Sequence, residues 1–460
     1  MSDMGQGETV IRTARVALRP TAGQRRRCFE ILRASGDVWA ALVELNQVRF
    51  RRLGPPVFSF TALCRELTGA DLGPLARICA EDVAKRYSNA CFETARRKKA
   101  GLRARYPHRK RSLYPTRFRF RVFAVEGQNL RLAVAKGHPP LRIRLSRALP
   151  YPPTSLRAVT LVGGAGRLFV DVSADVAVED HGLDPSEVAG VDVGIIHPYA
   201  LAGPSGVGLV ISGRALRAEE RLHLEDTKRR SAEMGRKAPR RGQRGSRRWR
   251  KLRATQRAAE ARHTAKIRQA HHEAAKGVVA WAIEHEIGTL VIGDPKGITA
   301  NDSGRRQNRR VNTTWRRAHL TAALVDKARV GGIHVELVDE RGTSSTCPAC
   351  GAHQRAVGRV FACSACGLHA HRDLVGATNI ARSRPGGIIE VPLGTSITHR
   401  RAGSPPARRD RRRHRFDTRR TARRSCPTPG RPFVRSMTGS RSRRGDPATA
   451  SAAAGSIRAT

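Results

Sequence analysis

Two closely spaced cysteine pairs constrain the fold of this chain more than any other feature of its sequence. Cys347 and Cys350 form one CxxC pair, Cys363 and Cys366 form the other, and twelve residues lie between the pairs. A glycine follows each pair and lets the chain turn tightly. Four thiolates placed this way can surround one Zn²⁺ as a tetrahedron. The spacing therefore predicts a zinc ribbon over residues 341–372 with a single structural ion, because no coordination position stays open.

Disulfide bonds are the alternative use of these cysteines, and the N-terminal sequence argues against them. The first residues, MSDMGQGETV, lack the apolar stretch of a secretory signal peptide. No apolar run reaches the roughly 18 residues that cross a bilayer. We therefore expect a cytoplasmic protein without a membrane partner, in a compartment where thiols stay reduced and available to metal.

The charge of the chain indicates a polyanionic partner. It has 87 Lys and Arg residues against 38 Asp and Glu residues, for a formal net charge of +49. Nucleic acid is the default partner of such a surplus. Runs of basic residues without acids favour phosphate contact over a merely solvated face. The candidate phosphate-binding residues are Arg25, Arg26, Arg27, Arg96, Arg97, Lys98, Lys99, Arg109, Lys110, Arg247, Arg248 and Lys251.

The end of the chain has a different character. From residue 385 to residue 460 the sequence is rich in Arg, Ser, Gly and Ala and has no apolar periodicity. A segment of this kind cannot bury enough apolar surface to fold. We expect a disordered basic tail there, which can add only electrostatic affinity for nucleic acid.

Residues 1–180 predict a nucleic-acid-binding region of strands and helices with a β-barrel-like character. Alternation over residues 9–18 favours a strand, and apolar residues then recur at helical intervals. A second helical region is expected over residues 61–97.

The period changes to two over residues 116–145, which predicts a small sheet. Arg117, Arg119 and Arg121 are expected to share one strand face, opposite the apolar residues between them. Two further strands, LRAVTLV and GRLFVDVSADV, follow with a glycine-rich turn between them.

A second domain is expected over residues 186–340, with a basic helical insertion at about 214–286. Strands that alternate with helices favour an α/β fold with a mixed sheet. The first strand, EVAGVDVG, places Asp192 in an otherwise apolar run. A lone buried carboxylate costs several kcal/mol unless it is paired or bound to metal. The acidic stretch at residues 179–187 indicates a linker before this domain.

Further carboxylates end later strands of the same domain. Asp294 follows the strand TLVIG, Asp339 and Glu340 end IHVELVDE, and Asp373 opens a final helix over residues 373–384. Sites form where such strands end at one sheet edge, and carboxylates gathered there repel one another unless divalent cations neutralise them. We therefore expect two Mg²⁺ or Mn²⁺ ions at this edge. Asp373 could instead cap its helix, and the spacing leaves both roles open.

Several motifs resemble the OrfB/TnpB family of transposon-encoded proteins over about residues 9–383: TSSTCPACG, FACSACGLHAHRDLVGATNI and GVDVG. RGSRRWRKLRA is similar to the basic helical stretch of that family, and RVALRPTAGQRRR to its start. The resemblance implies an RNase H-like (RuvC-like) domain in which Asp192 and Asp373 are metal ligands. It also implies an RNA-guided DNA endonuclease that binds guide RNA, double-stranded DNA and displaced single-stranded DNA at a prokaryotic nucleoid.

The second motif of that family, a strand ending in Glu-Asp, is incomplete in this chain. Gly293 stands where the glutamate is expected, directly before Asp294. Asp294 lies on the opposite strand face from position 293, whereas Glu340 ends what should be the neighbouring strand. We therefore expect Asp192, Glu340 and Asp373 to be the catalytic carboxylates, with Asp294 as the substitute candidate. Two alternatives stay open, a nuclease-dead RNA-guided DNA-binding regulator and a strand-transferring transposase, and the sequence leaves the oligomeric state open.

Overall fold

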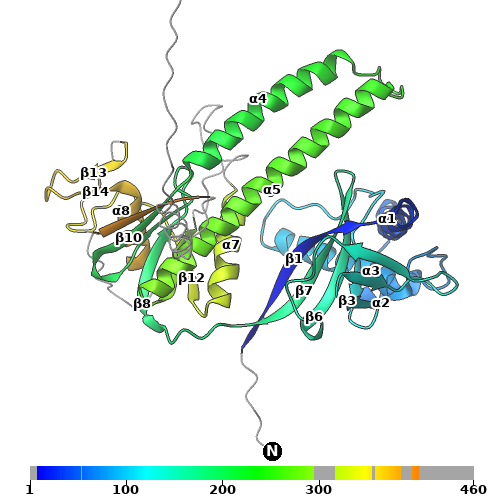
Figure 1. Ribbon diagram of the computed structural model, residues 1–460, viewed down its shortest axis with the longest axis horizontal. Coiled ribbons are helices and arrows are strands. Elements are labelled where there is room, and N and C mark those ends of the chain that lie inside the picture. The colour runs from blue at the N-terminus through cyan, green and yellow to red at the C-terminus, as the bar shows by residue number, and fades with distance from the viewer. Residues whose placement is uncertain (1–7, 53, 295–315, 355–357, 385–395, 403–460) are drawn as a thin grey trace, which may run out of the picture. The chain divides into compact units, whose positions relative to one another are not determined.

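The computed structural model describes residues 8–52, 54–294, 316–354, 358–384 and 396–402 (Figure 1). In this part of the chain the strands form three sheets, of seven, six and two strands. The seven-stranded sheet comes first in the sequence, and the six-stranded sheet carries the carboxylates singled out above.

The seven-stranded sheet is antiparallel and is accompanied by three helices. The helices are α1 (Ala22–Arg51), α2 (Phe60–Glu66) and α3 (Arg77–Lys99). The strands are β1 (Thr9–Arg19), β2 (Thr116–Arg119), β3 (Phe123–Glu126), β4 (Asn129–Leu132), β5 (Leu141–Leu145), β6 (Leu156–Gly164) and β7 (Arg167–Ala177). Their order is β2-β6-β7-β1-β5-β4-β3, and β1 joins the two halves because it pairs first with β7 and then with β5.

The helix expected after the first strand is confirmed as α1. It begins at a capping box in which Thr21 and Gln24 exchange side-chain to backbone hydrogen bonds. Apolar residues at helical spacing, among them Cys28, Ile31 and Leu32, are buried in the core that this helix shares with the sheet. Burial of this face stabilises the helix more than its intrinsic propensity does.

The prediction of one helical region over residues 61–97 is wrong in one respect: the helix is interrupted between α2 and α3. Gly69 and Gly73 lie in the interruption with φ angles of 78° and 53°. A right-handed helix cannot include such positive φ values. The two glycines therefore divide the region into two helices.

The strand face expected for Arg117, Arg119 and Arg121 is also wrong at its last residue. β2 ends at Arg119, and Arg121 adopts a φ of 74° that turns the chain. Phe120 is 62% exposed as a result. Arg121 therefore does not continue the strand face of Arg117 and Arg119.

The six-stranded sheet is mixed and has helices in the connections between its strands. Its strands are β8 (Asp184–Asp192), β9 (Tyr199–Ala202), β10 (Val207–Ser212), β11 (Ile287–Asp294), β12 (His334–Asp339) and β15 (Ser396–Arg401), in the order β12-β11-β8-β9-β10-β15. β8, β11 and β12 run parallel, whereas β9 is antiparallel to its two neighbours. The main helices are α4 (Arg214–Arg236), α5 (Arg247–Glu284), α7 (Arg317–Val330) and α8 (Arg372–Arg382). The α/β class with a mixed sheet is therefore confirmed.

β8 starts earlier than the sequence indicates. Residues 179–187 were expected to be a linker, yet Asp184 already pairs with Ile287 of β11. The two strands approach very closely at this point: a Cβ added to Gly288 would lie only 2.1 Å from the Asp184 carbonyl oxygen. Only a glycine permits that contact.

Alternation along β8 decides which helix each side chain meets. Ala189 and Val191 belong to the core that contains residues of α5 and α7. Val188 packs with Ile380 of α8 in a separate cluster. Because side chains alternate between the faces of a strand, Asp192 shares the α8 face with Val188.

Strand β15 corrects the prediction of disorder over residues 385–460. Ser396–Arg401 pair in parallel with β10 along its whole length. β10 would otherwise present an unpaired edge. Arg400 secures the strand by donating to the Gly277 carbonyl of α5 at 3.0 Å and by pairing with Glu284 at 3.4 Å. Ala402, the next residue, is buried in the core of this sheet, and the rest of the predicted tail lies outside the described residues.

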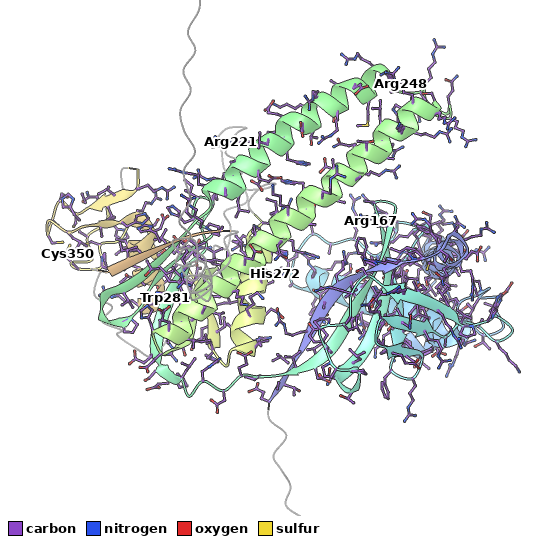
Figure 2. All side chains as sticks on the ribbon, in the orientation of Figure 1. Arg167, Arg221, Arg248, His272, Trp281 and Cys350 are labelled. Carbon is purple, nitrogen blue, oxygen red and sulfur yellow. The ribbon has the colours of Figure 1, made fainter. Side chains whose placement is uncertain are left out.

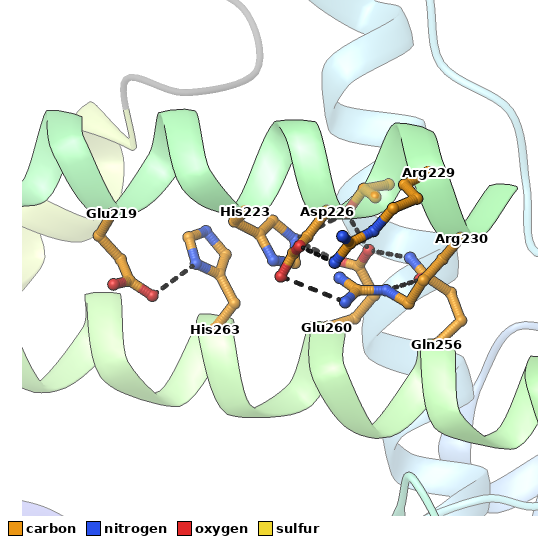
Figure 3. Close-up of polar contacts among 9 residues, drawn as sticks. Glu219, His223, Asp226, Arg229, Arg230, Gln256, Glu260 and His263 are labelled. Carbon is orange, nitrogen blue, oxygen red and sulfur yellow. Dashed lines mark hydrogen bonds and ion pairs between the residues drawn. The ribbon is translucent and has the colours of Figure 1, made fainter. Parts of the chain in front are cut away.

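Helices α4 and α5 form a long antiparallel pair held by polar contacts (Figures 1 and 3). His223 Nε2 lies 3.0 Å from Glu260 Oε2, and the His223 and His263 rings stack with centroids 3.8 Å apart. Arg230 donates to Gln256 at 2.6 Å. None of the described helices, including the 38-residue α5, is long and apolar enough to cross a membrane.

Candidate functional site

Asp192 lies at the carboxyl end of β8, against helix α8. A Cβ added to Gly190 would lie only 1.9 Å from the Ala377 carbonyl oxygen, which shows that the backbones of the strand and the helix are in direct contact. On the helix side, a Cβ on Gly376 would lie 3.4 Å from Asp192 Oδ2. Two glycines, one on each element, therefore bring the helix down onto the strand and leave room for the carboxylate.

Asp373 is the second residue of α8, and its carboxylate contacts His197 and Arg359. The N-cap residue is His371, whose Nδ1 accepts a hydrogen bond from the Asp373 backbone N–H at 3.3 Å. Asp373 Oδ2 lies 2.7 Å from His197 Nδ1, and both carboxylate oxygens lie 3.0 Å from Arg359 Nη1. The capping role that the sequence left open for Asp373 therefore belongs to His371.

Glu340 follows β12 and fills the space above Gly293. A Cβ on Gly293 would lie 2.3 Å from Glu340 Oε2 and 3.0 Å from Glu340 Cβ. The pairing of Gly293 with Val338 across β11 and β12 brings the two positions together. Glu340 Oε2 is buried and has no hydrogen-bond partner among the described residues. A buried carboxylate oxygen without a donor is costly unless a proton or a cation satisfies it.

Two of the three carboxylates act electrostatically on the third, Asp192. Burial, together with the charges of Asp373 and Glu340, raises the pKa of Asp192 to about 8. Burial is also the main cause that raises the pKa of Glu340 to about 7. Burial alone would raise the pKa of Asp373, but the hydrogen bond from His197 and the charge of Arg359 bring it below its usual value. Repulsion among buried carboxylates is what a divalent cation relieves.

Asp294, the substitute candidate, has a different partner. Its carboxylate pairs with Arg317 of α7 at 2.6 Å. Its charge raises the pKa of Glu340, whereas the acidic groups that raise the pKa of Asp192 are Asp373 and Glu340. Asp339, its neighbour across the strands, pairs with Arg341 at 3.7 Å. Both carboxylates are therefore held by arginines.

His197 is a residue of this site that the sequence reasoning missed. It lies in the connection between β8 and β9, where its carbonyl oxygen accepts a hydrogen bond from the Gly194 N–H at 3.2 Å. One donor atom each from His197, His371 and Asp373 lie within 4.8 Å of one another. The signal that could have found it is a histidine inside the otherwise apolar stretch GIIHPYA, shortly after Asp192.

The four cysteines come together as their spacing predicts. Cys347 Sγ lies 3.6 Å from Cys366 Sγ, and Cys350 Sγ lies 3.6 Å from Cys363 Sγ. All four sulfurs lie within 4.8 Å of one another (Figure 2 labels Cys350). Bonds of about 2.3 Å to a tetrahedral ion would hold sulfurs about 3.8 Å apart. The glycines that follow the pairs have φ angles of 76° and 71°, as the tight turns require. The cluster is compatible with a zinc site.

The segment that carries the cysteines also supports α8. Its strands β13 (Val360–Ala362) and β14 (His369–His371) pair directly before the helix. Val375 of α8 packs with two of the cysteines. Asn379 Nδ2 donates to two backbone carbonyls before the first cysteine, at 2.7 Å each. The cysteine cluster therefore helps to hold the helix that carries Asp373.

The candidate phosphate-binding residues of the N-terminal region are mostly exposed. Arg25 and Arg27 each donate to a backbone carbonyl, which fixes their direction. Lys110 pairs with Glu44 at 2.7 Å, and Arg96 pairs with Glu93 at 3.3 Å. Those exposed to solvent are Arg25, Arg26, Arg96, Arg97, Lys98, Lys99, Arg109 and Lys110.

The remaining candidates lie at the tip of the α4–α5 pair. Arg247, Arg248 and Lys251 are exposed on the first turns of α5. Figure 2 shows Arg248 at the opposite end of α5 from the core residue Trp281. The sequence between Glu233 and Glu260 contains no acid. This tip is therefore a concentrated patch of positive charge, suited to phosphates.

Comparison with known proteins finds a local match in sequence and a broader match in fold. Residues 318–380 match the family model described as Cas12f1-like, TNB domain. Over 114 residues the chain is 32% identical to the CRISPR-associated endodeoxyribonuclease Cas12f1 of Sulfoacidibacillus thermotolerans, covering 24% of this chain and 26% of that protein. The match thus spans about a quarter of the length of this curated relative.

Among solved structures, the Cas12f1 chain of a Cas12f1–sgRNA–target DNA complex aligns with a TM-score of 0.57 at 13% identity. The alignment covers 82% of this chain and 99% of that chain. At this identity the likeness concerns the fold alone. The comparisons together show local sequence similarity to Cas12f1 and a similar overall fold.

Proposed function

We propose that this chain is a metal-dependent, RNA-guided DNA endonuclease of the transposon-associated OrfB/TnpB type, with an RNase H-like (RuvC-like) catalytic domain. The observation that carries the proposal is the Glu340 side chain lying over Gly293, with a buried carboxylate oxygen that lacks a donor. Glu340 replaces the missing carboxylate of the second motif and acts on Asp192 together with Asp373. The likeness to Cas12f1 supports this class of activity.

Asp192, Glu340 and Asp373 would hold the catalytic cations, which we propose to be two divalent ions of the Mg²⁺ or Mn²⁺ class. Carboxylate oxygens are the ligands that these ions prefer. Cations bound there would activate a water molecule and neutralise the leaving oxygen of a phosphodiester. The chain itself contributes geometry, since a strand end, a helix start and a neighbouring strand end fix the three carboxylates.

The four-cysteine cluster would hold one structural Zn²⁺ and so keep the segment before α8 folded. The exposed basic residues described above would hold guide RNA and DNA, both double-stranded and displaced, through phosphates. The similar Cas12f1 structure is a complex with sgRNA and target DNA, which supports the proposal of these partners. We place the protein with the DNA in the cytoplasm of a prokaryotic cell.

The decisive variant is Glu340→Gln, which keeps the volume of the side chain and removes its charge. We expect Mg²⁺-dependent cleavage of a guided target to fall at least about 100-fold, because the cations lose a ligand and their fixed position. Binding of guide RNA should not change. Asp339→Asn, a carboxylate one residue away that pairs with Arg341, is the matched control and should stay active. Asp294→Asn should be milder than Glu340→Gln.

A fully active Glu340→Gln protein would refute the assignment of the third carboxylate. A wild-type protein that binds guided DNA but never cuts it, in Mg²⁺ or Mn²⁺, would instead support the nuclease-dead regulator. One observation favours that second candidate: Arg359 contacts both oxygens of Asp373 and could replace a cation there. Sequencing the RNA that copurifies with the protein from its native locus tests the guide, since random RNA would point to bulk charge alone.

A further inference from the structure

We propose that His197 and His371 add imidazole nitrogens to the carboxylate site, so that one cation position takes a first-row transition-metal ion in preference to Mg²⁺. The inference rests on the proposed function, because it concerns the same site. It goes further by adding two ligands and by choosing the class of cation. The geometric basis is the group of donor atoms from His197, His371 and Asp373, all within 4.8 Å of one another.

The distances suit ligands of a single cation. Two ligands with bonds of about 2.1 Å lie about 3.0 Å apart when neighbouring and about 4.2 Å apart when opposite. His197 Nδ1 lies 2.7 Å from Asp373 Oδ2, close to the neighbouring value. The His197 and His371 ring centroids lie 5.5 Å apart with the planes inclined by 44°. Small movements of the two rings would therefore place all three groups around one ion.

The backbone fixes both histidines beside the carboxylates. The connection that carries His197 is closed by two hydrogen bonds, from Gly194 N–H to the His197 carbonyl at 3.2 Å and from Gly213 N–H to the Ile196 carbonyl at 3.0 Å. His371 is the last residue of β14 and the N-cap of α8. Both positions are set by the same elements that set Asp192 and Asp373, so the donor group does not depend on a free loop.

The donor chemistry decides the class of cation. Mg²⁺ takes oxygen ligands, whereas imidazole suits first-row transition metals. A site with two imidazoles and a carboxylate therefore binds a transition ion more tightly than Mg²⁺. Mn²⁺ is the most useful probe, because it lies at the weak end of the affinity series for these metals. If the site binds Mn²⁺ more tightly than Mg²⁺, the other first-row divalent ions should be preferred over Mg²⁺ by at least the same factor.

The test is a direct measurement of bound Mn²⁺ on the full chain, without nucleic acid and with a single equivalent of zinc, which the four thiolates take in preference to the imidazoles. Pulsed electron paramagnetic resonance reports whether ¹⁴N is bonded to the ion. We expect imidazole ¹⁴N couplings in the wild type, and Mn²⁺ binding at least about 10-fold tighter than Mg²⁺ in competition. His197→Gln and His371→Gln should each weaken Mn²⁺ binding about 10- to 100-fold. The matched control is His334→Gln, an exposed histidine at the start of β12.

Bound Mn²⁺ without ¹⁴N coupling would overturn the inference, because the site would then hold its ion through oxygens and His197 would only position Asp373. The proposed nuclease would still stand in that case. The opposite outcome has two parts: the wild type fails to cleave DNA, and the ¹⁴N coupling of bound Mn²⁺ persists in the wild type, in Asp192→Asn and in Glu340→Gln. That outcome would support the histidine site and count against the proposed nuclease. Zinc content and thermal unfolding of each variant show whether it is folded, and the wild-type ¹⁴N measurement decides the question even if a variant is not.

Discussion

The cysteine cluster and the carboxylate cluster gather their ligands in opposite ways. The cysteines all lie between residues 347 and 366, in two CxxC pairs, and their sulfurs already approach to 3.6 Å. The carboxylates come from residues 192, 340 and 373, on two strand ends and a helix start. Local spacing is enough to assemble the first cluster. The second exists only when the strand register and the packing of α8 are correct.

The two clusters are nevertheless coupled through one helix. Val375 of α8 packs with the cysteines, and Asp373 of the same helix belongs to the carboxylate cluster. Arg359, which directly precedes β13, contacts Asp373. The cysteine cluster therefore supports the carboxylate cluster. We expect the carboxylate cluster to depend on the cysteine cluster, but not the reverse.

The largest effect should follow loss of the metal from the cysteine cluster. We expect Cys363→Ser to reduce bound zinc from about one ion per chain to nearly none, because structural zinc contributes about 10 kcal/mol or more to the folding of small zinc domains. Cleavage should be lost with it, since α8 loses its support. Metal analysis and a cleavage assay measure the two losses.

The control for that variant is Cys64→Ser, a half-buried cysteine outside the cluster, which should keep its zinc. The reverse experiment sharpens the comparison: Asp192→Asn should lose cleavage and keep its full zinc content. Full zinc occupancy in Cys363→Ser would contradict the assignment of the cluster.

A somewhat smaller effect should follow removal of the edge strand β15. A chain ending at residue 384 loses the ladder between β10 and β15 and the contacts of Arg400, which should lower the free energy of unfolding by about 3–5 kcal/mol. A chain ending at residue 402 keeps the strand and should differ mainly in the salt dependence of nucleic-acid binding. Urea unfolding and binding at two salt concentrations compare the two truncations. Equal stability of the two chains would show that β15 adds nothing to the sheet.

The buried histidine His271 of α5 allows the stability of the domain that carries the carboxylates to be tested without metal. Burial first, and then the nearby His319 and Arg316, lowers the pKa of His271 from 6.5 to about 4. The unfolded chain therefore takes up a proton near pH 6.5 that the folded chain refuses until about pH 4. The free energy of unfolding should fall by roughly 3 kcal/mol as the pH drops through this window. Urea unfolding at several pH values should show this slope in the wild type and in His334→Gln, and a shallower slope in His271→Gln.

The smallest effect should come from a single methyl group at the carboxylate site. In Gly293→Ala the new Cβ would lie 2.3 Å from Glu340 Oε2 and 2.8 Å from Ile380 Cδ1, which are ends of flexible side chains that can move away. It would also lie 3.0 Å from Glu340 Cβ, which needs a shift of only a few tenths of an ångström. We expect cleavage to fall about 10- to 100-fold through displacement of Glu340, with little change in melting temperature. In a Glu340→Ala background, which removes the contact with Oε2 but keeps the contacts with Cβ and Ile380, the same methyl should lower cleavage by a smaller factor. An equal loss in both backgrounds would mean that Gly293 acts without Glu340.

The sequence by itself determined the parts that depend on short-range spacing. The CxxC pairs and their glycines predicted the cysteine cluster because chelation needs ligands a few residues apart on tight turns. Strand alternation put Asp294 and position 293 on opposite faces. Runs of apolar residues gave α1 and the mixed sheet.

The tertiary structure alone decided which side chains from distant segments meet. No spacing in the sequence relates His197 to Asp373, or Ser396–Arg401 to the edge of β10, because those contacts are created when α8 packs on β8 and when an unpaired strand edge takes a partner. Glu340 was expected from the sequence as the end of a neighbouring strand, but its exact position was not. Its carboxylate occupies the space left by Gly293 because β11 and β12 pair in one particular register.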